Sequence, residues 1–324
     1  MIRSFDSFVG RMSYCYSKCL MMILQSKGEC YQLPFMECIT TAPFGFVYAP
    51  EDKGGFAVSG YNPHVSVGRA LRLLRYDNNF RSFSSSSVAL GFLRRTLEKD
   101  AVLIGPVDMG FLTYDRYREF KLGSDHYLVA TDVDDGNVVV NDPDGYVQVP
   151  IPIADFLRAW KADRIQYKRG PYSLWTIGRR RGKTPRRRIY KATLRLALRN
   201  LRERQEVKRA GRIVYCTGPK AIQRLADDIK RKRSSRWLRF YSTFTFRASA
   251  QKCFDSSIFI KEAPSSNASL SRASEIRMTQ ARLYSRTQLY GASNKFSQVS
   301  RTLSSISQLE EDFEKQLAVG LARI

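Results

Sequence analysis

Apolar and polar residues follow helical and strand periods over the first half of the chain. Apolar residues recur at helical intervals in the segments 14–25, 67–75, 88–98 and 153–160. The first of these segments has Ser13 as a candidate N-cap and Gly28 just past its end. The run 101–104 is continuously apolar and ends at Gly105-Pro106, which is typical of a buried strand.

A predicted hairpin follows that strand. Two β-rich apolar runs, 124–132 and 137–142, flank Asp134-Asp135-Gly136. This pattern is the sequence signature of an antiparallel β-hairpin. His126 and Asp142 are an even number of residues apart, so their side chains can share one face of the sheet. A loop centred on Asp134 would place them directly opposite, whereas a tight turn at Asp135-Gly136 would offset them by a few residues.

The composition changes at Gly178, and this change predicts two domains. With a strand at 174–177, residues 1–178 form an α+β domain. From Arg179 to Arg233 there are 21 Lys and Arg against 4 Asp and Glu, which accounts for 17 of the chain's net +24. Apolar residues at helical intervals predict a basic amphipathic helix in this segment and two long helices, 270–289 and 299–317, near the end. Residues 179–324 are therefore a basic, mainly helical domain.

The charge and the cysteines restrict the class of protein. A net charge of +24 over 324 residues predicts attraction to a polyanion, which is nucleic acid, an anionic membrane or an acidic protein. The six cysteines are scattered, unlike a disulfide framework, so we expect them to be reduced. The apolar run 19–24 is short for a signal peptide, and no stretch is long enough to span a membrane. These features favour a cytoplasmic protein.

Cys15 is the candidate nucleophile. It would lie in the first turn of its helix, where the helix dipole favours thiolate over thiol. Cys19, one turn later on the same face, is the rival nucleophile but would feel the dipole less. The alternative is that Cys15 is a small buried hydrophobic residue.

Only two histidines are available as a general base. His64 follows Asn62-Pro63, which indicates a loop residue with a surface role. His126 begins an apolar strand, and a carboxylate at Asp142 could orient its imidazole for work on a thiol. Asp142 also precedes Pro143, so it could instead be a turn residue that ends the strand.

Metal and phosphate sites are weaker alternatives. The N-terminal cysteines lack the paired short spacing of a zinc site. The segment 178–184 resembles a phosphate-binding loop but is one residue short between its glycines and is followed by Pro185. We therefore predict a basic linker there, and no metal or cofactor.

Four stretches resemble a known family, the butirosin-biosynthesis H proteins, whose N-terminal domain is papain-like and related to bacteriocin-processing cysteine peptidases. They are the helix headed by Cys15, residues 33–37 with 44–48, the segment 102–108, and the hairpin with His126 and Asp142. Residues 218–317 are similar to the helical C-terminal region of that family. The resemblance implies a papain-like cysteine-protease fold. It also implies transfer of an acyl group from an acidic acyl carrier protein (or CoA) thioester to a small-molecule amine acceptor.

The resemblance also assigns roles to residues. Cys15 would be the nucleophile, His126 the general base and acid, and Asp142 the orienting partner, while Glu37 matches a position with a structural role. One departure is that residues 8–14 contain no glutamine to stabilise an oxyanion, so backbone N–H groups at the helix start would have to serve. Two alternative functions remain: a cysteine peptidase or amidase of the same fold, and a non-catalytic protein that binds a polyanion through Arg179 to Arg233.

Overall fold

The computed structural model describes residues 14–52, 54–60, 62–203, 205–209, 212–264 and 267–323. The predicted N-cap Ser13 and most of the segment searched for a glutamine lie outside these residues. The chain forms two compact units. We call Ser13–Met36 with Asn62–Thr184 the sheet unit, and Glu37–Tyr61 with Pro185–Ile324 the helical unit.

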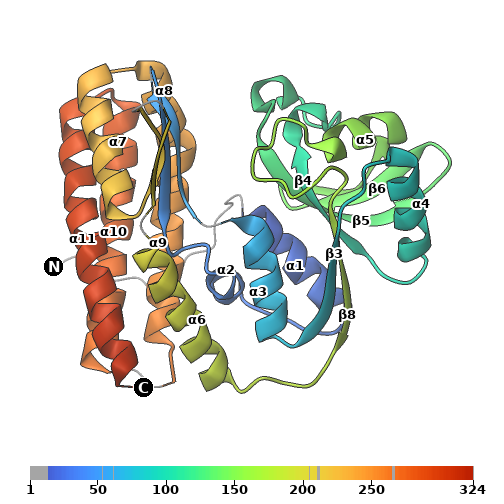
Figure 1. The fold of residues 1–324 in the computed structure, drawn as a ribbon, viewed down its shortest axis with the longest axis horizontal. Helices are drawn as coiled ribbons and strands as arrows, with labels where there is room; N and C mark the ends of the chain where they lie inside the picture. Colours follow the sequence, from blue (N-terminus) through green and yellow to red (C-terminus); the bar gives the residue numbers. More distant parts are fainter. Residues whose placement is uncertain are drawn as a thin grey trace. The chain divides into compact units, whose positions relative to one another are not determined.

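The sheet unit is built on an antiparallel six-stranded sheet of order β3-β8-β4-β5-β6-β7. Its strands are β3 (Tyr76–Arg81), β4 (Val102–Asp108), β5 (Asp125–Val133), β6 (Asn137–Asp142), β7 (Tyr146–Pro152) and β8 (Leu174–Arg180). Its helices are α1 (Cys15–Ser26), α2 (Leu33–Ile39, which ends in the helical unit), α3 (Pro63–Leu73), α4 (Ser86–Leu97), α5 (Ile153–Lys161), and the short turns η1 (Met109–Phe111) and η2 (Arg118–Lys121). Figure 1 shows α1 beside α3 in this unit.

The core of the sheet unit explains the placement of its helices. Apolar residues of β4, β5 and β6 pack with the buried faces of α4 and α5, whose anchors include Leu93 and Trp160. The helix α1 packs on β5 through its own apolar face, which includes Leu20, Ile23 and Leu24. That face is the 3.6-residue stripe expected from the sequence. It fixes the first turn of α1 next to the strand that carries His126.

The helical unit combines a small sheet with long helices. A four-stranded antiparallel sheet of order β2-β1-β10-β9 is made by β1 (Phe46–Glu51), β2 (Gly54–Ser59), β9 (Glu206–Arg209) and β10 (Arg212–Thr217). The helices are α6 (Arg186–Arg202), α7 (Pro219–Lys232), α8 (Ser235–Phe240), η3 (Tyr241–Thr245), α9 (Phe246–Lys261), α10 (Ala268–Ala292) and α11 (Phe296–Ala322). In Figure 1, α7, α10 and α11 lie side by side within this unit.

The architecture is α+β with a mainly helical C-terminal region, as predicted. The hairpin, the basic helix α6 and the two long C-terminal helices also match the predicted elements. Two features differ. The strand expected at 101–104 continues through Gly105-Pro106 to Asp108. Residues 37–61 pack with the helical unit, because β1 pairs with β10, whereas the predicted division placed all of 1–178 in one domain.

Candidate active site

Cys15 occupies the first position of α1, and its side chain is buried in the sheet unit with 7% of its surface exposed. The N-terminus of a helix carries partial positive charge, which favours a thiolate there. Burial acts in the opposite direction and raises the pKa of the thiol, while a hydrogen bond with His126 and the charge of that ring lower it. The ionisation of Cys15 therefore depends on its histidine partner.

His126 lies near the start of β5 and is 2% exposed. Its Nε2 is 2.8 Å from Oδ1 of Asp142, so Nδ1 is the nitrogen available to the thiol. Burial lowers the pKa of the imidazole, but the hydrogen bonds with Asp142 and Cys15 outweigh it and hold the pKa well above its usual range. The two groups titrate as a coupled pair, and the net pKa of the Cys15 thiol remains above its ordinary value.

Asp142 ends β6 and is anchored on three sides. Its Oδ1 accepts hydrogen bonds from His126 and, at 2.7 Å, from the backbone N–H of Asp144, while Oδ2 accepts one at 2.6 Å from the hydroxyl of Tyr114. Burial raises the pKa of this carboxyl group, but the bonds to His126, Tyr114 and Asp144 outweigh burial. The net pKa is lowered, so the group stays ionised. A carboxylate held in this way fixes both the orientation and the tautomer of His126.

The register of the hairpin explains how His126 reaches Asp142. Val129 pairs with Asn141, and a bulge between Ala130 and Asp132 shifts the register toward the turn. One further step along the strands sets Asp142 opposite residue 128, so His126 and Asp142 are diagonal neighbours on one face. The sequence left two arrangements open, directly opposite or offset by a few residues. The structure has the offset arrangement.

Cys19 does not join this group. Its side chain is fully buried, and its Sγ donates a 3.3 Å hydrogen bond to the carbonyl oxygen of Tyr127. Burial raises the pKa of this thiol well above its usual range, and the nearby Cys15 and Asp142 raise it further. Cys19 is therefore a structural cysteine, and Cys15 is the one in contact with a histidine.

The prediction that His64 is a surface loop residue is wrong. His64 lies in the first turn of α3, with Asn62 as N-cap, and is 1% exposed. Its ring makes edge contacts with Phe80, Tyr127 and Tyr167. Asn-Pro is also a helix start, because Pro is favoured at the first helical position. Burial and the charge of Arg169 lower the pKa of His64 to about 4, so the ring is neutral.

Further polar residues near Cys15 were not identified from the sequence. Asp125 precedes His126 on β5, and its Oδ2 accepts a 2.6 Å hydrogen bond from the Tyr167 hydroxyl. The charge of Asp125 raises the pKa of Cys15, and that of Cys15 raises the pKa of Tyr167. Tyr114 and Tyr167 lie outside helices and strands, where no periodicity marks them. The one signal that the sequence offers for them is an aromatic residue within a polar loop segment.

One group of side chains has the composition of a metal site. Within the described residues, one ligand atom each of His126, Asp142 and Asp144 lies within 4.8 Å of the others. The Nε2 atom of His126 is bonded to Asp142, and it cannot donate that hydrogen bond and bind a metal at the same time. The hydrogen bond to Asp142 therefore makes Nε2 of His126 unavailable to a metal.

Glu37, the position expected to be structural, is fully buried in the helical unit. Its Oε1 lies 3.8 Å from Nζ of Lys252, which is itself largely buried. A buried carboxylate needs such a partner to remain charged. This environment agrees with a structural role.

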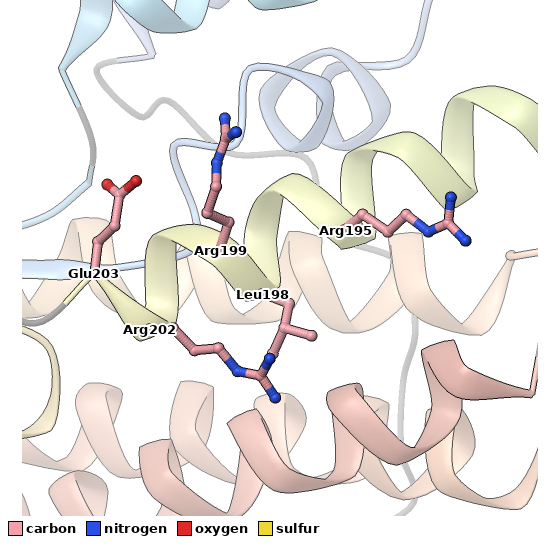
Figure 2. A pocket seen from close by; sticks show the side chains of 5 residues that line it. All are labelled: Arg195, Leu198, Arg199, Arg202 and Glu203. Carbon is pink, nitrogen blue, oxygen red and sulfur yellow. The ribbon is translucent and has the colours of Figure 1, made fainter.

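The basic segment forms an exposed surface on α6. This helix carries seven Arg and Lys and no acidic residue, and it buries Tyr190, Leu194, Ala197 and Leu201 against the helical unit. A shallow hollow of about 300 Å³ is lined by Arg195, Leu198, Arg199, Arg202 and Glu203. Figure 2 shows Arg199 and Glu203 directed to one side of α6, and Leu198 and Arg202 to the other. The guanidinium groups therefore diverge, which suits an extended anionic surface better than one small anion.

Among the described residues, no helix combines the length and the apolar character needed to cross a bilayer. All six cysteines are free thiols, and Cys30 is the exposed one.

Comparison with known proteins gives a relationship but no activity. A family model described as the YobF C-terminal domain matches residues 214–318, which lie in the helical unit from β10 to α11. The uncharacterized protein YobF of Bacillus subtilis (strain 168) is 25% identical over 312 residues, which cover 96% of this chain and 97% of that protein. This chain is therefore homologous to the B. subtilis protein over almost its full length, and its C-terminal segment matches the YobF C-terminal domain.

Proposed function

We propose that the protein is a cysteine-dependent acyltransferase that moves an acyl group from a carrier-protein or CoA thioester to an amine. The observation that carries the proposal is a group of three side chains: Cys15 at a helix start, His126, whose ring lowers the pKa of the Cys15 thiol, and Asp142, bonded to His126 at 2.8 Å. A nucleophile, a base and an orienting carboxylate are the parts that covalent acyl transfer requires. The resemblance to the butirosin-biosynthesis H proteins and a papain-like fold belong to the same proposal.

In the first step, the Cys15 sulfur attacks the thioester carbonyl while His126 holds the thiol proton. The tetrahedral oxyanion lies at the start of α1, where backbone N–H groups and the helix dipole stabilise negative charge. The carbon–sulfur bond of the donor then breaks, and its sulfur takes the proton from His126. The acyl group is left on Cys15 as a new thioester.

In the second step, an amine attacks the acyl-Cys15 carbonyl and forms the amide bond. His126 takes a proton from the attacking nitrogen and returns it to the Cys15 sulfur as the carbon–sulfur bond breaks. Asp142 stays ionised throughout because its pKa is lowered, and its charge stabilises the imidazolium. The free thiol is regenerated, so the cycle needs no metal or redox partner.

The partner proposed for α6 is an acidic acyl carrier protein. Arg195 and Arg199 are exposed, and neither has an ion-pair partner among the described residues, whereas Arg202 pairs with Glu314 at 3.4 Å. Unpaired surface cations steer an acidic partner and raise its association rate. Nucleic acid and an anionic membrane are the other polyanions that this surface could attract. A reduced nucleophilic thiol suits the cytoplasm, which we propose as the location.

The test is to incubate the full chain with butyryl-CoA, a butyrylated acyl carrier protein and a casein peptide mixture, and to follow it by intact mass. The expected result is a butyryl adduct on Cys15, absent from Cys15→Ser, retained in Cys19→Ser, and discharged by an added amine. Cleavage of the peptides without an adduct would instead identify a peptidase. The absence of both, with salt-sensitive binding of nucleic acid that survives Cys15→Ser, would identify a binding protein.

A further inference from the structure

Asp125, the residue before His126 on β5, has no cationic partner in the described part of the chain. It is half-buried, its Oδ2 accepts the hydrogen bond from Tyr167, and within the described residues nothing bonds to its Oδ1. Its negative charge raises the pKa of Cys15. In a chain with a net charge of +24, an acidic group left unpaired at the reaction centre is the exception to the overall charge.

A second observation at this place is independent of the carboxylate. The imidazole of His64 is almost completely buried, and neither of its ring nitrogens has a hydrogen-bond partner among the residues that the structure describes. Leaving a buried polar group unbonded is unfavourable, so these nitrogens favour a hydrogen-bonding ligand. Its ring lies in edge contact with Tyr167, 5.7 Å between centroids, so this unused acceptor adjoins the tyrosine that holds Asp125.

The rings around His64 also favour a cation. Phe80, Tyr127 and Tyr167 surround it, and Arg169 already places its guanidinium 4.9 Å from the centre of the Phe80 ring. Aromatic faces attract ammonium and guanidinium groups. The Asp125 carboxylate accepts hydrogen bonds, and one ring nitrogen of the neutral His64 imidazole can accept as well, so acceptors for an ammonium donor are present here.

We propose that Asp125, held by Tyr167 and backed by His64, binds the amine acceptor as its ammonium ion next to Cys15. This inference rests on the proposed acyl transfer and specifies its acceptor as a primary amine that is cationic in solution. The ammonium donates to Oδ1 of Asp125, while Oδ2 keeps its hydrogen bond from the Tyr167 hydroxyl. Asp125 is thus a specificity-determining residue, while Cys15, His126 and Asp142 perform the chemistry.

The proton balance of the transfer follows from this placement. The bound ammonium loses one proton to solvent at the half-exposed Asp125, which frees the lone pair on nitrogen. That lone pair forms the carbon–nitrogen bond, and the electrons of the carbon–sulfur bond return to Cys15. The second nitrogen proton passes through His126 to the sulfur. The products are an amide, the free thiol and one proton released to solvent.

The first experiment measures binding without requiring turnover. Iodoacetamide alkylation of Cys15 is followed by peptide mapping with n-butylamine or n-butanol as competitor. We expect n-butylammonium to slow alkylation in the wild type and n-butanol not to do so. In Asp125→Asn the concentration of n-butylammonium needed should rise about tenfold or more, because a hydrogen bond to a charged group is lost. Asp132→Asn, the same charge change at an exposed position of β5, is the control.

The second experiment measures transfer from butyryl-Cys15 to two nucleophiles. Asp125→Asn should raise the KM for n-butylamine about tenfold or more and leave the KM for hydroxylamine, which is uncharged near neutral pH, unchanged. Equal protection by the amine and the alcohol, or equal losses for both nucleophiles, would overturn the subsite. A wild type that is protected by n-butylammonium but forms no butyryl-Cys15 would retain the subsite and reject the proposed function.

Discussion

The Tyr114 hydroxyl donates a 2.6 Å hydrogen bond to Oδ2 of Asp142, the carboxylate oxygen that does not face His126. Tyr114 enters this contact from the segment between η1 and η2, and its ring lies 4.6 Å from that of Tyr146. The Asp142 carboxylate is thereby held from outside the hairpin. The loop that precedes β5 and the turn that follows β6 are joined through one side chain.

We predict that Tyr114→Phe lowers the free energy of unfolding by about 1–3 kcal/mol, because a buried charged acceptor loses its donor while the ring packing is kept. The pKa of Asp142 should rise, since one of the bonds that lowers it is gone. Urea unfolding measures the first effect. Tyr117→Phe, an exposed tyrosine in the same loop, is the control and should change stability by less than about 0.5 kcal/mol. Equal effects of the two variants would contradict a specific bond to Asp142.

The hairpin could be predicted because its signals are local. The turn at Asp134-Asp135-Gly136 and the two apolar runs lie within about twenty residues, and the Asp134 carboxylate caps the turn as expected of Asp. The bulge at Ala130 was not predictable, because nothing in the sequence marks which residue is extra. Yet the bulge decides the final offset of His126 and Asp142.

The small sheet of the helical unit could not be predicted, because its pairings are remote in sequence. Val47 pairs with Thr217, some 170 residues away. Residues 46–59 carry strand-like patterns, but their partner strand follows a basic helix that contains no hint of the pairing. Tyr114 and Asp125 were missed for a related reason: only the folded chain shows which loop residue reaches a carboxylate or a thiol.

The reactivity of Cys15 should depend on His126. In the wild type, iodoacetamide should alkylate Cys15 near neutral pH, because the imidazole accepts the thiol proton. In His126→Ala the interactions with the ring that lower the pKa of Cys15 are lost while burial remains, so this pKa should rise further above 9.0. The rate near neutral pH should then fall tenfold or more and recover only in alkaline solution. Cys30, which is exposed, is the internal control in the same peptide map. An unchanged rate for Cys15 would show that His126 does not activate it.

His64 should make the sheet unit less stable in acid. Its folded pKa is about 4, below the unfolded value of about 6.5, so the folded state binds fewer protons. The free energy of unfolding is therefore unaffected by the titration of His64 above pH ~6.5. It falls by about 3 kcal/mol in total as the pH is lowered toward 4.

Urea unfolding in a Trp237→Phe background reports this unit through Trp160 and Trp175. His64→Phe should remove the part of the pH dependence that lies between the two pKa values. His126→Ala should leave that part in place, since the pKa of His126 is shifted in the opposite direction. The same slope in His64→Phe and in the parent would show that His64 is not buried as a neutral ring.

The helical unit depends on a buried ion pair. Nη1 of Arg277 lies 2.7 Å from Oε2 of Glu310, and its guanidinium lies 3.7 Å from the centre of the Phe313 ring. Arg277→Met leaves Glu310 buried without its cation and should cost about 3–5 kcal/mol. Adding Glu310→Met should recover most of that loss, because the uncompensated charge is removed. Urea unfolding followed at Trp237 measures both variants, and a double variant as unstable as the single one would contradict this account.

The basic face of α6 should act on the carrier protein and not on the chemistry. Arg195→Glu with Arg199→Glu reverses two unpaired charges one turn apart, so it should raise the KM for a butyrylated acyl carrier protein tenfold or more. It should leave the KM for the small thioester butyryl-N-acetylcysteamine unchanged, because that donor has no acidic surface. Arg282→Glu with Arg286→Glu makes the same change one turn apart on the exposed face of α10 and is the matched control. The difference between the two pairs should shrink in high salt, since screening weakens exposed charges. If both pairs raise the KM equally, overall charge and not α6 recruits the carrier protein.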